Sequence, residues 1–170
     1  MPRAFLILVI LALAAAIGMG NRPARANSAP LPPEEDLAII VHKSNPTDNL
    51  SFAELRQIFM EEKSHWSNGR KVTVVMRDLG QPERDSVLRE IYRMREPDFN
   101  KYFLHAQFTG ESLEPPKLLS TATGVLRFVF NVPGAIGYVR ASEVDPSVKV
   151  VMIDGLAPRT AGYKIKLIGP

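Results

Sequence analysis

Residues 72–95 read VTVVMRDLGQPERDSVLREIYRMR, and this stretch decides the fold class. Residues 72–76 have the length and the apolar, β-branched composition of a buried strand. Gly80, Gln81 and Pro82 then turn the chain, and a proline suits the first helical position because its missing N–H would be unpaired there anyway. Apolar residues recur at helical spacing from there to about Arg95. The stretch therefore predicts a strand followed directly by a helix.

The same alternation of strands and helices extends in both directions. On the N-terminal side, residues 37–42 predict a buried strand, and Ser51 with Glu54 forms a capping box that starts a helix over about residues 51–60. The order predicts a three-layer αβα domain around a mixed or parallel sheet. The elements expected on the C-terminal side are a short helix after Pro97 that carries Phe99, Tyr102 and Phe103, a helix over residues 118–131, and strands over residues 135–139 and 148–153.

The first 26 residues predict a Sec-type signal peptide. Arg3 supplies a positive charge, residues 4–19 are apolar except for Gly18, and residues 24–26 form a small-x-small cleavage site. The apolar run is shorter than the roughly 20 residues of a membrane-spanning helix, so we expect cleavage after Ala26, with an uncleaved anchor as the alternative. The mature protein is then periplasmic or secreted, with no stable membrane span.

The remaining chain divides into three parts. Residues 27–36 contain three prolines and predict an extended linker. Residues 37–154 hold the predicted strands and helices and form the domain. Residues 155–170 are expected to be a C-terminal tail.

Charge and cysteine content exclude several classes of protein. The chain of 170 residues has a formal net charge of +3, and three arginines of the predicted leader account for the whole excess. The exported part therefore has no bias toward nucleic acid or anionic lipid. The absence of cysteine excludes disulfides, thiol catalysis, Cys-ligated zinc and an acylated lipoprotein cysteine.

The sequence offers no motif for catalysis. His42, His65 and His105 are far apart and show no metal-binding spacing, and the chain contains no nucleophile elbow, Walker loop or dinucleotide fingerprint. We therefore expect no catalytic residue, no metal and no cofactor, and a protein that is not an enzyme. A hydrolase would require one of these histidines to meet a serine or aspartate in a cleft.

The turn after the strand at residues 72–76 is the strongest candidate for a binding site. Ligands of α/β domains bind where strands end and helices begin, and Arg77 offers a bidentate fork for a phosphate or a carboxylate. The alternative is that Arg77 pairs with Asp78, Glu83 or another acid of the surface. Glu83 also places a carboxylate where an anionic ligand would lie.

Four segments carry a resemblance to a known family. Residues 50–59 (LSFAELRQIF) resemble the L-S-x-x-E-L-x-x-I-F helix of type 2 periplasmic solute-binding domains, in the branch of the phosphate ABC-transporter binding proteins. Residues 66–72 (WSNGRKV) resemble their W-x-D-G-x-x-V segment, and residues 133–139 (PGAIGYV) their P-G-A-I-G-Y-V strand. Residues 108–116 match their F-x-G…P-P segment. The resemblance covers about residues 37–153.

The resemblance implies a function and a set of site residues. It implies an exported solute-binding protein for phosphate or another small oxyanion, with an ABC transporter or another envelope protein as its partner. The residues expected to bind the ligand are Arg77, which matches the family motif, and Gly80 and Gln81 in the same loop. Ser44 and Thr47 are weaker candidates for the rim, because they are polar loop residues near a strand end.

Two departures from the family pattern bear on the ligand. The relatives have an R-x-x-x-S-G-T loop here, whereas this chain keeps Arg77 but has Gln81, Pro82 and Glu83 in place of Ser, Gly and Thr. Two hydroxyls and an amide donor are lost and a negative charge is gained, which argues against high affinity for phosphate. The expected mature chain also suffices for one lobe only, so its site is an open half-site. The alternative function is a periplasmic protein-interaction module that keeps the lobe without the ligand site.

Overall fold

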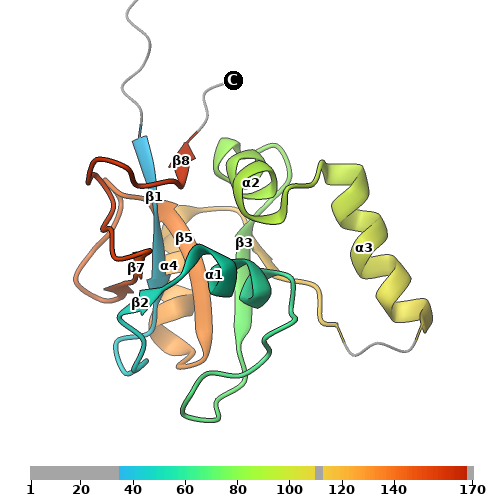
Figure 1. Cartoon of the computed structure of the whole chain (residues 1–170), viewed down its shortest axis with the longest axis horizontal. Coiled ribbons are helices and arrows are strands. Elements are labelled where there is room, and N and C mark those ends of the chain that lie inside the picture. Colours follow the sequence, from blue (N-terminus) through green and yellow to red (C-terminus); the bar gives the residue numbers. More distant parts are fainter. Residues whose placement is uncertain (1–34, 110–112, 168–170) are drawn as a thin grey trace, which may run out of the picture. The chain divides into compact units, whose positions relative to one another are not determined.

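The computed structural model describes residues 35–109 and 113–167, which form one α/β domain (Figure 1). The predicted leader and most of the predicted linker lie outside the described residues. The strands are β1 (Glu35–Val41), β2 (Asn49–Leu50), β3 (Thr73–Arg77), β4 (Lys117–Leu119), β5 (Ala135–Arg140), β6 (Lys149–Val150), β7 (Met152–Ile153) and β8 (Lys166–Leu167). The helices are α1 (Phe52–Phe59), α2 (Pro82–Val87), the π-helix η1 (Leu88–Tyr92), α3 (Glu96–Thr109) and α4 (Ala122–Asn131).

The main sheet is mixed, which is one of the two arrangements that the sequence predicts. Its strands follow the order β4-β3-β5-β1-β6, and β8 also pairs with β1. β3 runs parallel to β4 and β5, whereas β1 runs antiparallel to β5, β6 and β8. The short strands β2 and β7 form a separate parallel pair.

Both faces of the main sheet are covered, so the described domain has the predicted three layers. Alternate residues of β1 belong to different cores: Ile39 packs with the helices α1, η1 and α3, while Ile40 packs with α4. Figure 1 shows α1 in front of the sheet and α4 behind it. A central strand that is buried on both faces explains why its sequence is continuously apolar instead of alternating.

Local signals explain where two of the helices begin. The Ser51 hydroxyl accepts from the Glu54 N–H at 3.2 Å, and the Glu54 carboxylate accepts from the Ser51 N–H at 3.1 Å, which completes the predicted capping box of α1. Pro82 occupies the first position of α2. The helix then widens into η1 and ends at Arg93, whose φ of 56° is left-handed.

Three predicted elements differ from the structure. The helix expected over residues 118–131 begins only at Ala122, because residues 117–119 form the edge strand β4 and Thr121 caps the helix. Pro97 does not precede the next helix but lies in the first turn of α3, where its missing N–H costs no hydrogen bond. The strand expected over residues 148–153 is divided at Val151 into β6 and β7, which pair with different strands.

The segment expected to be a tail packs into the domain through Leu167. β8 pairs with the first residues of β1, which the sequence analysis assigned to the linker. Tyr163 and Ile165 are buried in the core, and the Tyr163 hydroxyl donates to the Leu37 carbonyl at 2.9 Å. Among the described residues, the structure contains no helix long and apolar enough to cross a lipid bilayer.

Candidate functional site

The residues predicted to line a site lie at opposite ends of the strands of the main sheet. The end of β1 and the start of β3 share one partner on β5, Ile136, because β1 is antiparallel to β5 and β3 is parallel to it. Ser44 and Thr47 follow β1, so they lie near the start of β3. The β3–α2 junction, residues 77–83, lies at the other end of that strand. The structure therefore does not bring Ser44 and Thr47 together with the junction.

The hydrogen bonds of the loop after β1 are those of ordinary turns. The Ser44 N–H donates to His42 Nδ1 at 3.0 Å, and the Ser44 hydroxyl lies 2.8 Å from the same nitrogen. The Thr47 N–H donates to the Asn45 side chain at 2.9 Å. The His42–Ser44 pair is exposed to solvent and both residues belong to one turn. These contacts are local to the turn and give no support to a hydrolase at His42.

Arg77 ends β3 and is buried, with 8% of its surface exposed. Its N–H donates to the Tyr138 hydroxyl at 3.0 Å, which fixes the backbone. In the side chain, Nη2 donates to Gln81 Oε1 at 3.0 Å, while Nε is buried and has no hydrogen-bond partner. Within the described residues Arg77 forms no ion pair. The junction thus holds a buried cation that lacks a counter-charge in contact.

The turn that follows Arg77 determines how the junction is shaped. Gly80 has a φ of +77°, a conformation that disfavours side chains, and a Cβ there would meet nothing within 4 Å. Gln81 precedes α2 but makes no side-chain cap, and its oxygen accepts from Arg77 instead. α2 spans six residues and continues into η1.

Glu83 places a carboxylate inside the junction and is 4% exposed. Its Oε1 accepts from Arg140 Nε at 2.6 Å, and Arg140 also pairs with Glu35 at 3.5 Å. Its Oε2 is buried and has no hydrogen-bond partner among the described residues. Burial raises the pKa of Glu83, but the Arg140 hydrogen bond, its own N–H and the charges of Arg140 and Arg77 together lower that pKa below its usual value. Glu83 is therefore ionised at neutral pH.

Arg84 is a buried residue that the sequence analysis did not identify. It is 2% exposed, and its Nε and Nη2 donate to both oxygens of Glu96 at 2.8 and 2.7 Å. Its Nη1 donates to the Arg77 carbonyl at 3.0 Å, and its guanidinium lies 5.1 Å from the centre of the Phe99 ring. Burial alone lowers the pKa of Arg84, but Glu96 outweighs it and raises the pKa. Arg84 thus holds α2, α3 and β3 together.

The helical spacing of the apolar residues that follow Arg84 is the sequence signal that places it on the buried face. Arg84 lies three residues before Val87, four before Leu88 and seven before Ile91, which is the spacing of one helix face. Those three residues are buried, and the spacing places Arg84 on the same face of the helix.

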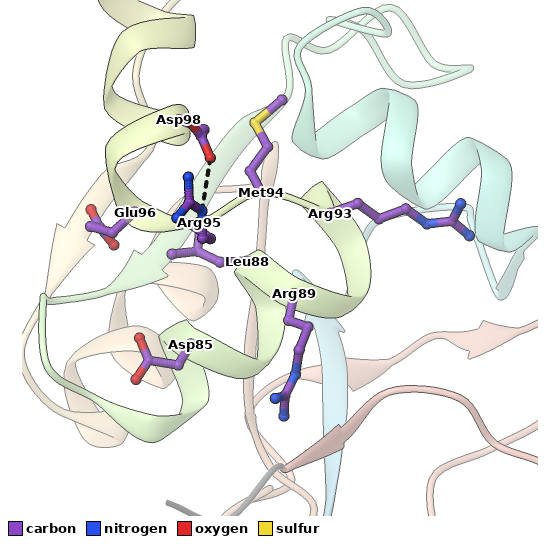
Figure 2. Close-up of a pocket in the computed structure, with 8 residues that line it drawn as sticks. All are labelled: Asp85, Leu88, Arg89, Arg93, Met94, Arg95, Glu96 and Asp98. Carbon is purple, nitrogen blue, oxygen red and sulfur yellow. Dashed lines mark hydrogen bonds and ion pairs between the residues drawn. The ribbon is translucent and has the colours of Figure 1, made fainter.

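Two pockets lie near the junction but neither is lined by Arg77 or Gln81. The larger, of about 880 Å³, is shown in Figure 2 and is lined by Asp85, Leu88, Arg89, Arg93, Met94, Arg95, Glu96 and Asp98. Three arginines and three acids balance there, and Arg95 is turned toward Asp98 at 3.3 Å (Figure 2). The smaller, of about 260 Å³, is mainly apolar and includes Leu79, Phe99 and Leu118. Within residues 35–109 and 113–167 we find no group of three side chains that could hold a metal ion.

Several solved structures share this fold. A substrate-binding protein of the phosphate ABC-transporter type from Clostridium perfringens, with phosphate bound, matches with a TM-score of 0.59 and 24% identity over 72% of this chain and 46% of that chain. An ABC-type phosphate transport receptor from Vibrio cholerae matches with a TM-score of 0.61 and 20% identity over 74% of this chain and 48% of that one. PstS from Borrelia burgdorferi matches with a TM-score of 0.61 and 16% identity over 79% and 55%.

These matches establish the fold of the described domain and show how much of each solved structure it covers. No family model matches the sequence. The chain spans about half the length of the solved structures that it resembles. The mixed sheet, the helices on both of its faces and these structural matches agree with the resemblance found in the sequence. The described domain therefore has the fold of a lobe of the phosphate-binding proteins.

Proposed function

We propose that this chain is an exported solute-binding protein that holds a small oxyanion at Arg77. The observation that supports the proposal is the buried Arg77 guanidinium, which has a donor without an acceptor and no ion pair among the described residues. A buried charge is costly unless it is paired, and oxyanions suit the planar donor fork of arginine. An anionic ligand would supply the missing counter-charge.

The family resemblance supports the choice of phosphate as the first anion to test. The solved structure from Clostridium perfringens contains phosphate. In this chain Arg77 is the main ligand residue, Gly80 gives the turn its shape, and Gln81 orients the guanidinium by accepting from Nη2 at 3.0 Å. The ABC transporter, or another envelope protein, is the partner that this function implies.

Thermal unfolding with and without anions tests the proposal. We expect phosphate to raise the Tm, because a ligand at about ten times its Kd stabilises the folded state by about 1.4 kcal/mol. Arg77→Met should abolish the shift. The matched control is Arg95→Met, since Arg95 is exposed and pairs only with Asp98 among the described residues. No shift with phosphate, arsenate or sulfate, or an equal shift in Arg77→Met, would contradict the proposal.

A further inference from the structure

We propose that Glu83 is an internal occupant of the anion site, a carboxylate of the chain itself that competes with ligand anions for the arginines of the junction. This inference rests on the proposed function, because it concerns how the same site is controlled. It assigns to Glu83 the role of setting the affinity for the anion.

The first support is the incomplete hydrogen bonding of the Glu83 carboxylate. One oxygen accepts from Arg140 Nε at 2.6 Å, while the other is buried without a partner. A carboxylate that serves only to hold a fold together usually has both oxygens satisfied, as Glu96 has through Arg84. Arg140 therefore holds the Glu83 carboxylate through one of its two oxygens.

The second support is the matching deficit of Arg77. Its Nε is a buried donor without an acceptor, and Glu83 Oε2 is a buried acceptor without a donor. Arg77 ends β3 and Glu83 lies in the first turn of α2, at the two ends of one short junction. The positive charge of Arg77 contributes to lowering the pKa of Glu83. The Glu83 carboxylate already compensates part of the positive charge that a ligand anion would compensate.

The third support is the balance of charge around the junction. Arg84 and Glu96 form a closed pair, and Arg140 is shared by Glu83 and Glu35. Asp78 in the turn and Glu143 beside Arg140 add further negative charge. A bound anion would add a negative charge beside the ionised Glu83, and like charges in a buried site repel each other strongly. Binding is therefore opposed for as long as Glu83 keeps its place and its charge.

Phosphate titrations of matched variants test this role. Glu83→Gln keeps the shape of the side chain and an oxygen for Arg140 but removes the charge, and we expect it to lower the Kd for phosphate at least tenfold. Glu62→Gln removes one charge from an exposed position and should change the Kd less than twofold. Arg77→Met combined with Glu83→Gln should abolish binding again.

The outcomes separate this inference from the proposed function. If the unmodified protein binds phosphate through Arg77 and Glu83→Gln binds no tighter, the inference is overturned and the function stands. If the unmodified protein does not bind phosphate and Glu83→Gln binds it through Arg77, the inference stands and the proposed function is overturned. If neither protein binds phosphate, both are overturned.

An NMR measurement keeps the inference testable if Glu83→Gln does not fold. The Nε–H signals of Arg77 and Arg140 are followed while phosphate is added to the unmodified protein. Competition with Glu83 predicts that both signals move together, because displacement of the carboxylate changes its 2.6 Å hydrogen bond with Arg140. Movement of the Arg77 signal alone, or of neither signal, would overturn the inference.

Discussion

Arg77 and Arg84 are both buried, the first within the β3–α2 junction and the second directly after it. They differ in the groups that surround their side chains. The Arg84 guanidinium meets a carboxylate with two hydrogen bonds, a backbone carbonyl and an aromatic ring. The Arg77 guanidinium meets one amide oxygen and keeps an unpartnered Nε. Burial alone therefore does not distinguish a structural arginine from a candidate binding residue. The two kinds of arginine are distinguished by whether all donors of the buried guanidinium have hydrogen-bond partners.

The largest effect should come from Arg84→Met. Its removal leaves Glu96 without its bidentate partner and the Arg77 carbonyl without a donor, and we expect a loss of about 3 kcal/mol in the free energy of unfolding. Chemical denaturation measures this loss. Arg95→Met is the control, since Arg95 is 85% exposed in its side chain and should contribute little to stability. An equally small loss in Arg84→Met would contradict the structural role of Arg84.

Acid titration should give the next effect, through Glu83. Because the pKa of Glu83 in the folded protein lies below its usual value, Glu83 contributes stability that is present above the pKa of an unfolded glutamate, about 4.3, and is lost as the pH falls through the folded pKa. We expect Glu83→Gln to flatten this acid limb of the free energy of unfolding, measured by urea denaturation at a series of pH values. Glu62→Gln should keep the slope of the unmodified protein. An unchanged slope in Glu83→Gln would mean that Glu83 is not ionised and paired as described.

The smallest effect should come from Arg77→Met. The substitution removes one hydrogen bond to Gln81 but also removes a buried charge that has no ion pair among the described residues, and these two effects oppose each other. We expect the free energy of unfolding to change by less than about 1 kcal/mol, in either direction. Chemical denaturation beside Arg84→Met checks this. A loss as large as that of Arg84→Met would make Arg77 a structural residue too.

The order of strands and helices was predictable because its signals are local. Apolar runs, a capping box and a proline at a helix start each act over a few residues, and the structure confirms them at β1, α1 and α2. β4 was missed because Lys117 and Leu118 are exposed on an edge strand, which leaves no pattern of alternation. Tyr163 and Ile165 belong to an alternating run, residues 163–167 (YKIKL), so a short strand signal is present there and the prediction of a tail was wrong.

The direction of the strands explains the outcome for the candidate site. Arg77 was identifiable because it directly follows an apolar run. Ser44 and Thr47 follow such a run too, but β1 is antiparallel to β5, and strand direction depends on pairing between residues about a hundred positions apart. The contact between Glu83 and Arg140 joins residues 57 positions apart and has no local signal either.

Trp66 gives the molecule a built-in optical reporter. It is the only tryptophan of the chain, it is 4% exposed, and its indole N–H donates to the Gly134 carbonyl at 2.9 Å, beside the turn that leads into β5. Its emission should shift to longer wavelength when water reaches the ring, without any added label. Trp66 and Gly134 lie 68 residues apart in the sequence, in the segments that precede β3 and β5. The fluorescence of the protein therefore reports when these two segments separate.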